Sequence, residues 1–347
     1  MTEASFLFLS QEDVVAAGGL EIGPTIEAVA EALRLHATGG TVLPHKPTIR
    51  WSEDLDSEER DGRIMAMPAY VGGSFDVAGL KWIPSVPTNP SRGLPRGIGL
   101  IVLTSRETGL PLAIMDGTVV SAMRTAAVTG ISCRLLARAG ARVAALIGAG
   151  AQARTQLRAL RHELPALEEV RLFDLSSERA RAFAAEAAMA GGDEDAIPFV
   201  VSSSAEEACR GADVIVPVTI APEPYIPPSW LAPGSLFVSI SSLDPTVEVV
   251  QQADVLVCDD WEHETGHAAR PLARALAEGA VTRERVVELG ELLVGSKPGR
   301  TSDDQRVFVA PVGLAIEDVA AAHRVWRSAV QLGIGTRLDL WRSPIWV

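Results

Sequence analysis

Two histidines in residues 263–267, which read HETGH, have the spacing of a zinc-binding pair. On one helix, His-Glu-x-x-His directs both imidazoles at a zinc ion, and the glutamate serves as the general base of a hydrolase. Gly266 costs about 1 kcal/mol in a helix interior, and Pro271 would clash with the carbonyl of His267. We therefore expect a polar loop that leads into a helix near RPLARALAEG, and no metal site. A zinc hydrolase is the remote alternative. Its third ligand would come from Glu284, Glu288 or Glu291.

A second stretch, IGAGAQA, has the glycine spacing of a dinucleotide-binding turn, with Gly148, Gly150 and Ala153 at the three key positions. It follows an apolar run and precedes a stretch with helical spacing, which is the context that this pattern requires. A pyrophosphate would lie against the N-terminus of that helix. Asp174, at the end of VRLFD, can accept hydrogen bonds from the adenosine ribose and would repel a 2′-phosphate, so the pattern favours NAD over NADP. The alternative is a structural turn with a capping aspartate.

Three basic residues occur where charge is unexpected. Arg50 ends LPHKPTIR, Lys81 alternates with apolar residues in VAGLKWIPSV, and Arg124 lies near the start of MRTAAVTGISCRLLA. Each one alone is explained by a side chain whose stem packs on apolar surface while its charge reaches water. Together, beside a nicotinamide, they could hold the carboxylate of a substrate, because guanidinium groups bind carboxylates in bidentate geometry.

From about residue 141 the chain alternates short apolar runs with helical stretches. The runs RVAALIG, EVRLFDL, IPFVVSS, ADVIVPV, GSLFVSI and ADVLVCDD are typical of strands, and AQARTQLRALRHEL, SSERARAFAAEAAMA and SAEEACRG are typical of helices. Alternation at this pace predicts parallel βαβ units, and the apolar, β-branched strands suit a sheet that is covered on both faces. The expected fold class is therefore α/β, with a doubly wound Rossmann-type NAD domain over residues 129–312.

The first third of the chain predicts a different, α+β architecture. GPTIEAVAEALRLHA has helical spacing, RIMAMPAYV, DVAGLKWIPSV and GIGLIVLTS alternate as antiparallel strands do, and TSRETGLPLAIMDG is typical of a hairpin. Near the other end, VGLAIEDVAAAHRVWRSAVQLGIG predicts an amphipathic helix that packs back on this first part. The second domain is thus discontinuous and comprises residues 1–128 and 313–347.

The composition narrows the possible partners and the compartment. The 347 residues, 47 % of them hydrophobic, are enough for two domains, and a formal net charge of −13 disfavours nucleic acid. Cys133, Cys209 and Cys258 fit no disulfide framework and indicate a reducing compartment. The N-terminal stretch is not typical of a signal peptide, and no uninterrupted apolar run reaches about 18 residues. We therefore expect a cytoplasmic protein that does not enter a membrane.

The chain resembles the ornithine cyclodeaminase/mu-crystallin family over most of its length. The resemblance rests on RIMAMPAYVGG, AGLKWI, RGLPRGIGLIVL, ETGLPLAIMDGTVVSAMRTAAVTG, IGAGAQA and ELGELLVGSKPGRTSDDQRVFVAPVGLAIEDVA. It implies a homodimer in which one domain binds the substrate and forms the dimer, while the other binds NAD(P). It also implies hydride transfer at the α-carbon of an amino acid.

The resemblance further implies roles for individual residues. The positions that hold the substrate carboxylate in the family are matched by Arg50, Lys81 and Arg124. Those that meet the phosphates and the rest of the dinucleotide are matched by Arg124, Thr125, Gly148, Gly150, Ala151, Gln152 and Asp174. Those that line the nicotinamide are matched by Thr219 and Val312, and Val312 is also expected to contact the substrate.

Asp244 is the candidate for the acidic residue with which cyclodeaminases assist deprotonation and ring closure. It lies in SISSLDPTVEV, which lacks the glycines and the lysine of the cyclodeaminase segment and looks more like the branch that cleaves N-(2-amino-2-carboxyethyl)glutamate. The expected function is therefore that of an amino-acid dehydrogenase or imine reductase that works through an imine intermediate, with Lys81 as a carboxylate ligand or an acid/base. The alternative is an ornithine or lysine cyclodeaminase that releases ammonia with catalytic NAD. A cofactor-binding protein without turnover is a third possibility, which the complete set of Arg50, Lys81, Arg124 and Asp244 disfavours.

Overall fold

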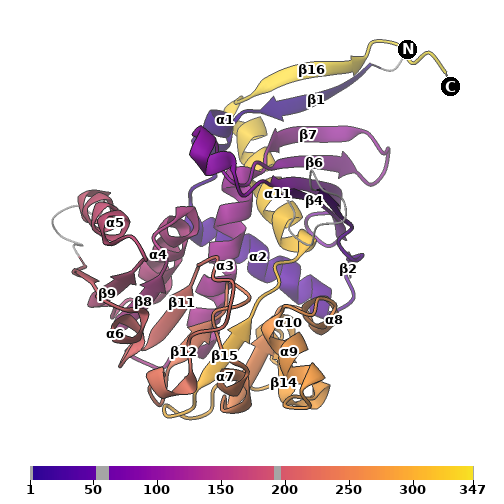
Figure 1. Cartoon of the computed structure of the whole chain (residues 1–347). Helices are drawn as coiled ribbons and strands as arrows, with labels where there is room; N and C mark the ends of the chain where they lie inside the picture. Colours follow the sequence, from indigo (N-terminus) through magenta and orange to yellow (C-terminus); the bar gives the residue numbers. More distant parts are fainter. Residues whose placement is uncertain (1–2, 52–61, 191–196, 347) are drawn as a thin grey trace. The chain divides into compact units, whose positions relative to one another are not determined.

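The computed structural model describes residues 3–51, 62–190 and 197–346. The chain divides into two compact units (Figure 1). Unit 1 is formed by Met1–Arg124 together with Leu314–Val347, and unit 2 by Thr125–Gly313. The boundaries predicted from the sequence are 128/129 and 312/313. The chain leaves unit 1 after Arg124 and returns to it at Leu314.

Unit 1 is built on a sheet whose strands lie in the order β16-β1-β7-β6-β5-β4-β2, with β3 paired to β4 outside this path. Its strands are β1 (Ala4–Leu9), β2 (Thr41–Val42), β3 (Thr48–Trp51), β4 (Gly62–Val71), β5 (Val77–Ser85), β6 (Leu100–Ser105), β7 (Pro111–Asp116) and β16 (Thr336–Trp341). Neighbours are antiparallel apart from β1 and β7, which run parallel. The antiparallel strands β4, β5 and β6 and the hairpin of β6 and β7 confirm the prediction for this part of the chain.

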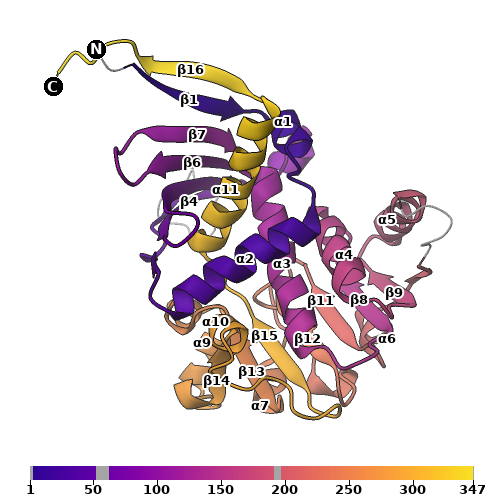
Figure 2. The same cartoon turned by 180° about the vertical axis from the view of Figure 1, so that it is seen from behind.

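Helices cover this sheet in two layers. The helices of unit 1 are α1 (Gln11–Ala16), α2 (Ile22–Ala37) and α11 (Ala315–Leu332). Helix α11 packs against β4, β5 and β6, and α2 packs against α11 (Figure 2). A Cβ atom added to Gly79 of β5 would lie 2.8 Å from Cγ2 of Val319, so the strand and α11 approach each other closely. The prediction that the C-terminal helix packs on the first part of the chain is confirmed.

Unit 2 is built on a parallel sheet with the strand order β10-β9-β8-β11-β12-β15-β13-β14. Its strands are β8 (Val143–Ile147), β9 (Glu169–Phe173), β10 (Phe199–Val201), β11 (Val214–Pro217), β12 (Leu236–Val238), β13 (Val255–Cys258), β14 (Val286–Glu288) and β15 (Val307–Ala310). The first five neighbours follow the Rossmann order 3-2-1-4-5 when they are numbered from β8. Strands β14 and β15 are not among those expected from the sequence.

Helices of unit 2 connect these strands. They are α4 (Ala151–Glu163), α5 (Ser177–Ala190), α6 (Ala205–Cys209), α7 (Val247–Gln251), α8 (Trp261–Thr265), α9 (Pro271–Ala277) and α10 (Leu289–Leu293). Short 3₁₀ turns span Asn89–Arg92 in unit 1 and Pro228–Trp230 and Arg283–Arg285 in unit 2. The strand order reverses between β10 and β11, so right-handed crossovers place the helices before and after the reversal on opposite faces. The predicted fold class, a Rossmann-type unit with a discontinuous α+β unit, is confirmed.

Helix α3 (Thr118–Leu136) continues from unit 1 into unit 2. Of the helices in the described ranges, it is the one with the length and apolarity of a membrane-crossing helix. However, 72 % of its most apolar window is buried inside the protein, and a core helix meets the same two criteria. Its composition is therefore weak evidence for a membrane span.

Candidate active site

Four charged side chains of unit 1 meet in what we call the charged cluster: Lys81, Arg124, Glu317 and Asp318. Lys81 comes from β5, where buried and less buried positions alternate and residue 81 falls on the covered face, while Arg124 comes from α3 and the two acids from the first turn of α11. Lys81 Nζ lies 2.7 Å from Asp318 Oδ2. Arg124 donates from Nε to Asp318 Oδ1 (3.0 Å) and from Nη1 to Glu317 Oε2 (2.9 Å). Asp318 therefore bridges the two cations.

Burial changes the acid–base chemistry of this cluster. Lys81 is 1 % exposed and both carboxylates are 0 % exposed. The pKa of Lys81 is lowered to about 7, chiefly because a buried ammonium loses its hydration and also because Arg124 repels it, whereas Asp318 acts in the opposite direction. Its Nζ also donates to Ser121 Oγ at 3.1 Å. An amine whose pKa is near neutrality can both accept and release a proton at physiological pH, as a general acid–base catalyst must.

The third predicted basic residue, Arg50, lies outside the charged cluster. It occupies an exposed position on β3, opposite Arg63 in the ladder with β4. The positive charge of Lys46, which precedes β3, lies near enough to Lys81 to contribute to the lowering of its pKa. The structure thus brings Lys81 and Arg124 together, adds Lys46 to their surroundings and leaves Arg50 on the surface of unit 1.

Glu317 and Asp318 are candidate functional residues that sequence reasoning missed. Acidic residues in the first turn of a helix are ordinary, because they oppose the helix dipole. The available signal was their setting, since GLAIEDVAAA is otherwise apolar and buried acids are rare unless they are paired. Their partner Arg124 lies 193 and 194 positions earlier in the chain, a separation that no local pattern reveals.

The glycine turn after β8 has the geometry that a dinucleotide requires. Gly148 has a φ of +105°, and a Cβ atom added there would lie 3.1 Å from the carbonyl oxygen of Val218, which follows β11. Gly150 is the N-cap of α4; it has no side chain to cap the helix, and a Cβ atom added to it would meet nothing within 4 Å. Since β8 and β11 flank the point where the strand order reverses, this is the crevice where Rossmann folds bind their ligand.

Three further predicted cofactor residues lie on helices. Ala151 and Gln152 form the start of α4, where backbone N–H groups have no partner within the helix and can donate to phosphate oxygens. Thr125 is half-buried on α3, one position after Arg124. The residues of the turn therefore fit a pyrophosphate, as the sequence predicts.

Asp174 follows β9 and binds the glycine turn itself. Its Oδ2 accepts a hydrogen bond from Ala149 N (2.9 Å), while Oδ1 accepts from Ser176 N (2.9 Å) and from Nε and Nη2 of Arg179 (3.2 and 2.9 Å). The carboxylate is thus close to the turn that would hold the pyrophosphate. It shapes that turn in addition to any bond that it makes with a ribose.

Thr219 and Asp244 lie together at the ends of β11 and β12. Thr219 Oγ1 donates to Asp244 Oδ1 at 2.5 Å, Tyr225 Oη donates to the same oxygen at 3.0 Å, and Ser241 Oγ bonds to Oδ2. The carboxylate is 0 % exposed, and burial together with its charge raises the pKa of Tyr225. Because hydroxyls of unit 2 occupy both of its oxygens, the geometry favours a role in holding Thr219. Tyr225 and Ser241 were not expected from the sequence.

Val312, the other residue predicted at the nicotinamide, lies in the loop that follows β15. Its backbone N–H donates to Asp259 Oδ1 at 2.9 Å, and the next N–H, of Gly313, donates to Asp259 Oδ2 at 2.6 Å. Asp259 directly follows β13, which is the neighbour of β15 in the sheet. This segment is therefore at the carboxyl end of the parallel strands, where the glycine turn also lies.

The HETGH segment does not form one helix. Helix α8 ends before Gly266 and α9 begins at Pro271, as these two residues predict, so His263 and His267 do not share a helix. The expectation of a polar loop is wrong at His263, which lies in a helical turn because Asp260 Oδ1 accepts its backbone N–H at 2.8 Å. Among the residues that the structure describes, no group of three or more histidine, cysteine, aspartate or glutamate side chains is arranged to hold a metal.

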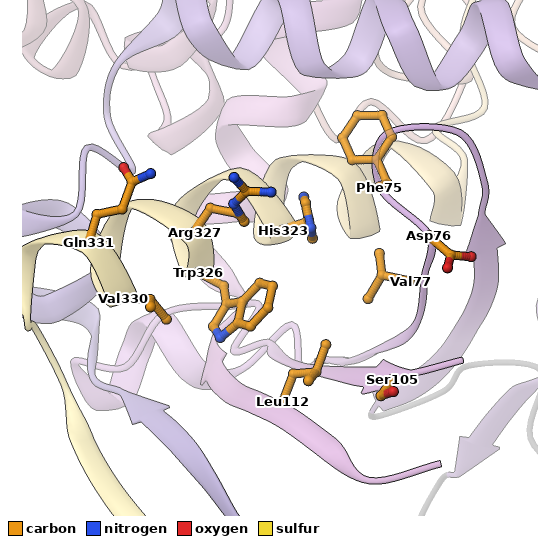
Figure 3. A pocket seen from close by; sticks show the side chains of 10 residues that line it. All are labelled: Phe75, Asp76, Val77, Ser105, Leu112, His323, Trp326, Arg327, Val330 and Gln331. Carbon is orange, nitrogen blue, oxygen red and sulfur yellow. The ribbon is translucent and has the colours of Figure 1, made fainter. Parts of the chain in front are cut away.

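A pocket of about 530 Å³ lies elsewhere in unit 1, between α11 and the strands beneath it (Figure 3). Figure 3 shows His323, Trp326 and Val330 of α11 on one side and Leu112 of β7 on the other. Burial, with the nearby charge of Arg327, lowers the pKa of His323 to about 4. The pocket is thus lined by apolar side chains and a neutral imidazole together with polar and charged groups, among them Asp76, Arg327 and Gln331, and none of the predicted site residues lines it.

Known proteins resemble this chain over nearly its whole length. A model of the ornithine cyclodeaminase/mu-crystallin family matches residues 7–332. The N-((2S)-2-amino-2-carboxyethyl)-L-glutamate dehydrogenase of Staphylococcus aureus is 34 % identical over 96 % of this chain and 98 % of its own length.

Two solved structures resemble the whole chain. An archaeal alanine dehydrogenase dimer with bound NAD is 33 % identical and has a TM-score of 0.85. The match covers 97 % of this chain and 100 % of the alanine dehydrogenase chain. The Δ1-pyrroline-2-carboxylate reductase of Thermococcus litoralis, in complex with NADH and L-proline, is 29 % identical and also has a TM-score of 0.85. This match covers 95 % of this chain and 99 % of the reductase chain.

Proposed function

Because the chain belongs to the ornithine cyclodeaminase/mu-crystallin family, we propose that it oxidises the bond between the α-carbon and the nitrogen of a small amino acid, or reduces the corresponding imine. It is an enzyme, and its cofactor is NAD. The observation that carries the proposed reaction is the charged cluster, in which a buried amine with a pKa of about 7 contacts Asp318 beside Arg124.

The charges of the cluster suit a zwitterion better than a simple anion. With Lys81 protonated, its two cations balance its two carboxylates. Arg124 is the more exposed of the two cations, and its guanidinium charge would attract a substrate carboxylate. The negative charge of Glu317 and Asp318 favours a positive charge on the nitrogen, as in an ammonium or an iminium ion. An α-amino acid carries both charges on one carbon atom.

Lys81 is the acid–base group in the proposed reaction. During oxidation its neutral amine accepts the proton that the substrate nitrogen must lose before the α-carbon can release a hydride. Asp318, 2.7 Å away, then stabilises the ammonium form of Lys81. Water hydrolyses the imine to a keto acid and an amine, and in the reductive direction the proton returns from Lys81 to the nitrogen. Bound NAD supplies the acceptance or donation of the hydride, which no side chain can provide.

Residues of unit 2 hold the cofactor in this proposal. The backbone at Gly148, Gly150 and the start of α4 binds the pyrophosphate, and Asp174 binds the adenosine ribose. Thr219 and Val312 face the nicotinamide. We assign Asp244 a positioning role, because its buried carboxylate holds Thr219 through a hydroxyl bond.

Replacing Asp174 with alanine is expected to weaken NADH binding by about tenfold, since it removes charge-assisted hydrogen bonds to the ribose and to the glycine turn. Titration of NADH fluorescence measures the dissociation constant. Glu186→Ala is the matched control, because it also removes a carboxylate that pairs with an arginine on the surface of unit 2. Equal affinities in Asp174→Ala and the parent protein would remove Asp174 from the cofactor site.

The first substrate to test is N-((2S)-2-amino-2-carboxyethyl)-L-glutamate, on which the S. aureus relative acts by name. Alanine, proline, ornithine and lysine complete the panel. Each is incubated with NAD while NADH absorbance and released ammonia are followed together. Net formation of NADH with at least one of these compounds supports the proposal. Ammonia without a net change in NADH indicates the cyclodeaminase alternative, and no turnover in either direction with any compound or its imine contradicts both.

We also propose that the chain forms a homodimer through unit 1 and works in the cytoplasm. The archaeal alanine dehydrogenase is a dimer, and most of the exposed large hydrophobic side chains of this chain lie in unit 1. Among them are Val330 and Leu332 on α11, and Leu338 and Leu340 on β16. The cytoplasmic location is supported by Cys133, Cys209 and Cys258, which are all free thiols.

Light scattering is expected to give a mass of about twice 36.7 kDa for the parent protein. Val330→Glu should shift the protein toward the monomer, because Val330 is 53 % exposed beside the apolar pocket of α11 and a buried charge at an interface is costly. Ile220→Glu, at an exposed apolar residue of unit 2, is the control and should leave the mass unchanged. A monomeric parent protein at micromolar concentration would contradict the proposed dimer.

A further inference from the structure

The segment that contains HETGH contacts the backbone that carries Val312. We call residues 259–270 the clasp, because its two ends hold the chain at residues 311–313. At the first end, the carboxylate of Asp259 accepts the N–H groups of Val312 (2.9 Å) and Gly313 (2.6 Å), one on each oxygen. Asp259 is 1 % exposed, so these charge-assisted bonds are made away from water.

The other end of the clasp reaches the carbonyl groups of the same backbone. Arg270 Nη1 lies 3.5 Å from the carbonyl oxygen of Pro311, and Nη2 lies 3.4 Å from that of Val312. The peptide groups on both sides of Val312 are therefore bonded on their N–H and C=O sides. Gly313 has a φ of +73°, so the chain turns sharply directly after the held residue.

The polar residues of HETGH hold the clasp together. Asp260 caps α8 and also contacts His263 Nδ1 at 2.8 Å. Glu264, which is 0 % exposed, accepts the N–H of Leu272 at 3.3 Å and so ties α8 to the start of α9. The residues of the pattern that suggested a zinc site thus shape the segment between Asp259 and Arg270, in which Asp259 and Glu264 are buried.

We propose that the clasp positions Val312 against the nicotinamide ring and that Asp259 is its principal positioning residue. The inference rests on the placement of Val312 at the nicotinamide in the proposed function. Asp259 follows β13 and Val312 follows the neighbouring β15, so both lie at the edge of the sheet where Rossmann folds bind their cofactor. Two bonds from one carboxylate fix the orientation of two successive peptide groups and therefore the direction of the Val312 side chain.

A binding experiment with two ligands isolates this role without needing a substrate. NADH and ADP-ribose share the adenosine, the pyrophosphate and the second ribose, but ADP-ribose lacks the nicotinamide. Asp259→Asn puts an amide N–H₂ where one of the two backbone N–H groups needs an acceptor, so one of the two bonds is lost. We expect this variant to raise the dissociation constant for NADH by about tenfold and that for ADP-ribose by less than about twofold.

Asp213→Asn is the matched control. Asp213 is also buried: its Oδ2 accepts two backbone N–H groups, those of Arg142 and Val143, at 2.7 and 2.9 Å, and its Oδ1 pairs with Arg138, so the asparagine amide loses an interaction here too. It precedes β11 and therefore lies at the amino end of the strands, remote from the cofactor edge. We expect it to lower the thermal midpoint about as much as Asp259→Asn does and to leave both dissociation constants within about twofold of the parent values. Arg270→Lys is a second clasp variant, for use if Asp259→Asn does not fold, and should weaken NADH selectively as well.

The outcomes separate the inference from the function on which it rests. Selective loss of NADH affinity in the clasp variants supports the inference. Equal changes for NADH and ADP-ribose, or selective loss in Asp213→Asn too, would overturn it while the proposed function stands. If the parent protein binds neither ligand, the proposed function fails, and the inference fails with it.

Discussion

Replacing Lys81 with methionine is expected to lower kcat/KM by about a thousandfold, because the variant has no group at this position to take up the proton of the substrate nitrogen. Methionine keeps the length and the apolar stem of the side chain, so the packing of β5 against α11 is retained. Steady-state rates measured with the substrate that the amino-acid screen identifies give the ratio. NADH affinity should stay within about twofold of the parent value, since the groups proposed to hold the dinucleotide are the glycine turn, the start of α4 and Asp174. A loss of less than tenfold would exclude Lys81 as the acid–base group.

The pH dependence of the same two proteins tests the lowered pKa. In the oxidative direction Lys81 must be neutral, so the parent rate should rise with pH through about 7, and in the reductive direction the rate should fall through the same range. Both limbs should be absent from the residual activity of Lys81→Met. A parent profile that is flat between pH 6 and 8 in both directions would contradict the assignment.

The free energy of unfolding should depend on pH as well. The pKa of Lys81 is about 7 in the folded chain, whereas an unperturbed lysine, as in the unfolded chain, has a pKa of 10.5. Between these two pH values the unfolded chain therefore binds more protons than the folded chain. The contribution of Lys81 to the free energy of unfolding therefore rises with pH across that window and is constant below it. The difference between the parent protein and Lys81→Met, measured by urea unfolding at pH 7 and 9, should change in that direction.

Replacing Asp318 with asparagine is expected to reduce the free energy of unfolding by about 3–5 kcal/mol, which is the usual cost of breaking a buried ion pair by removing one partner. Asp318 is 0 % exposed and is bonded to both Lys81 and Arg124, so its loss removes a buried charged partner from each of them and leaves Glu317 as the one carboxylate of the charged cluster. Urea unfolding monitored by tryptophan fluorescence measures the change.

The control for this prediction is Asp76→Asn. Asp76 pairs with Arg106 at 2.6 Å, but both side chains are more than half exposed, and exposed pairs contribute only about 0–1 kcal/mol. Asp76 has a φ of +42°, which asparagine also tolerates. If the two substitutions destabilised the protein equally, burial could not be the source of the effect at Asp318.

The sequence predicts those parts of the site whose chemistry is local. IGAGAQA identifies a glycine turn between a strand and a helix, because the tight turn and the helix N-terminus are made by neighbouring residues. Lys81 is conspicuous because charge interrupts an alternating apolar strand. The break at Gly266 and Pro271 is likewise a local property of the backbone. In each of these cases, the residues that determine the structure lie within one short stretch.

The features of the site that could not be predicted from the sequence depend on contacts between segments that are distant in the chain. The sequence suggests Arg124 as a ligand of the substrate carboxylate, but it does not reveal that Glu317 and Asp318 also bond to it. The carboxylate of Asp244 is an acid–base candidate in isolation, but in the fold three hydroxyl groups surround it. Asp259 is one acid among several in VLVCDDWEHE, and its role depends on the segment after β15, a distant strand that was not expected from the sequence.

The separation between Arg124 and its two carboxylates sets an order of events during synthesis. Residues 317 and 318 leave the ribosome 193 and 194 positions after Arg124, a delay of roughly 10–40 s at typical translation rates of about 5–20 residues per second. Throughout that interval Lys81 and Arg124 lack their partners Glu317 and Asp318. The N-terminal segment also lacks α11, the helix that packs on its sheet. Unit 2 is continuous in the chain and can complete its own core first, so the chain is expected to fold from its middle outward.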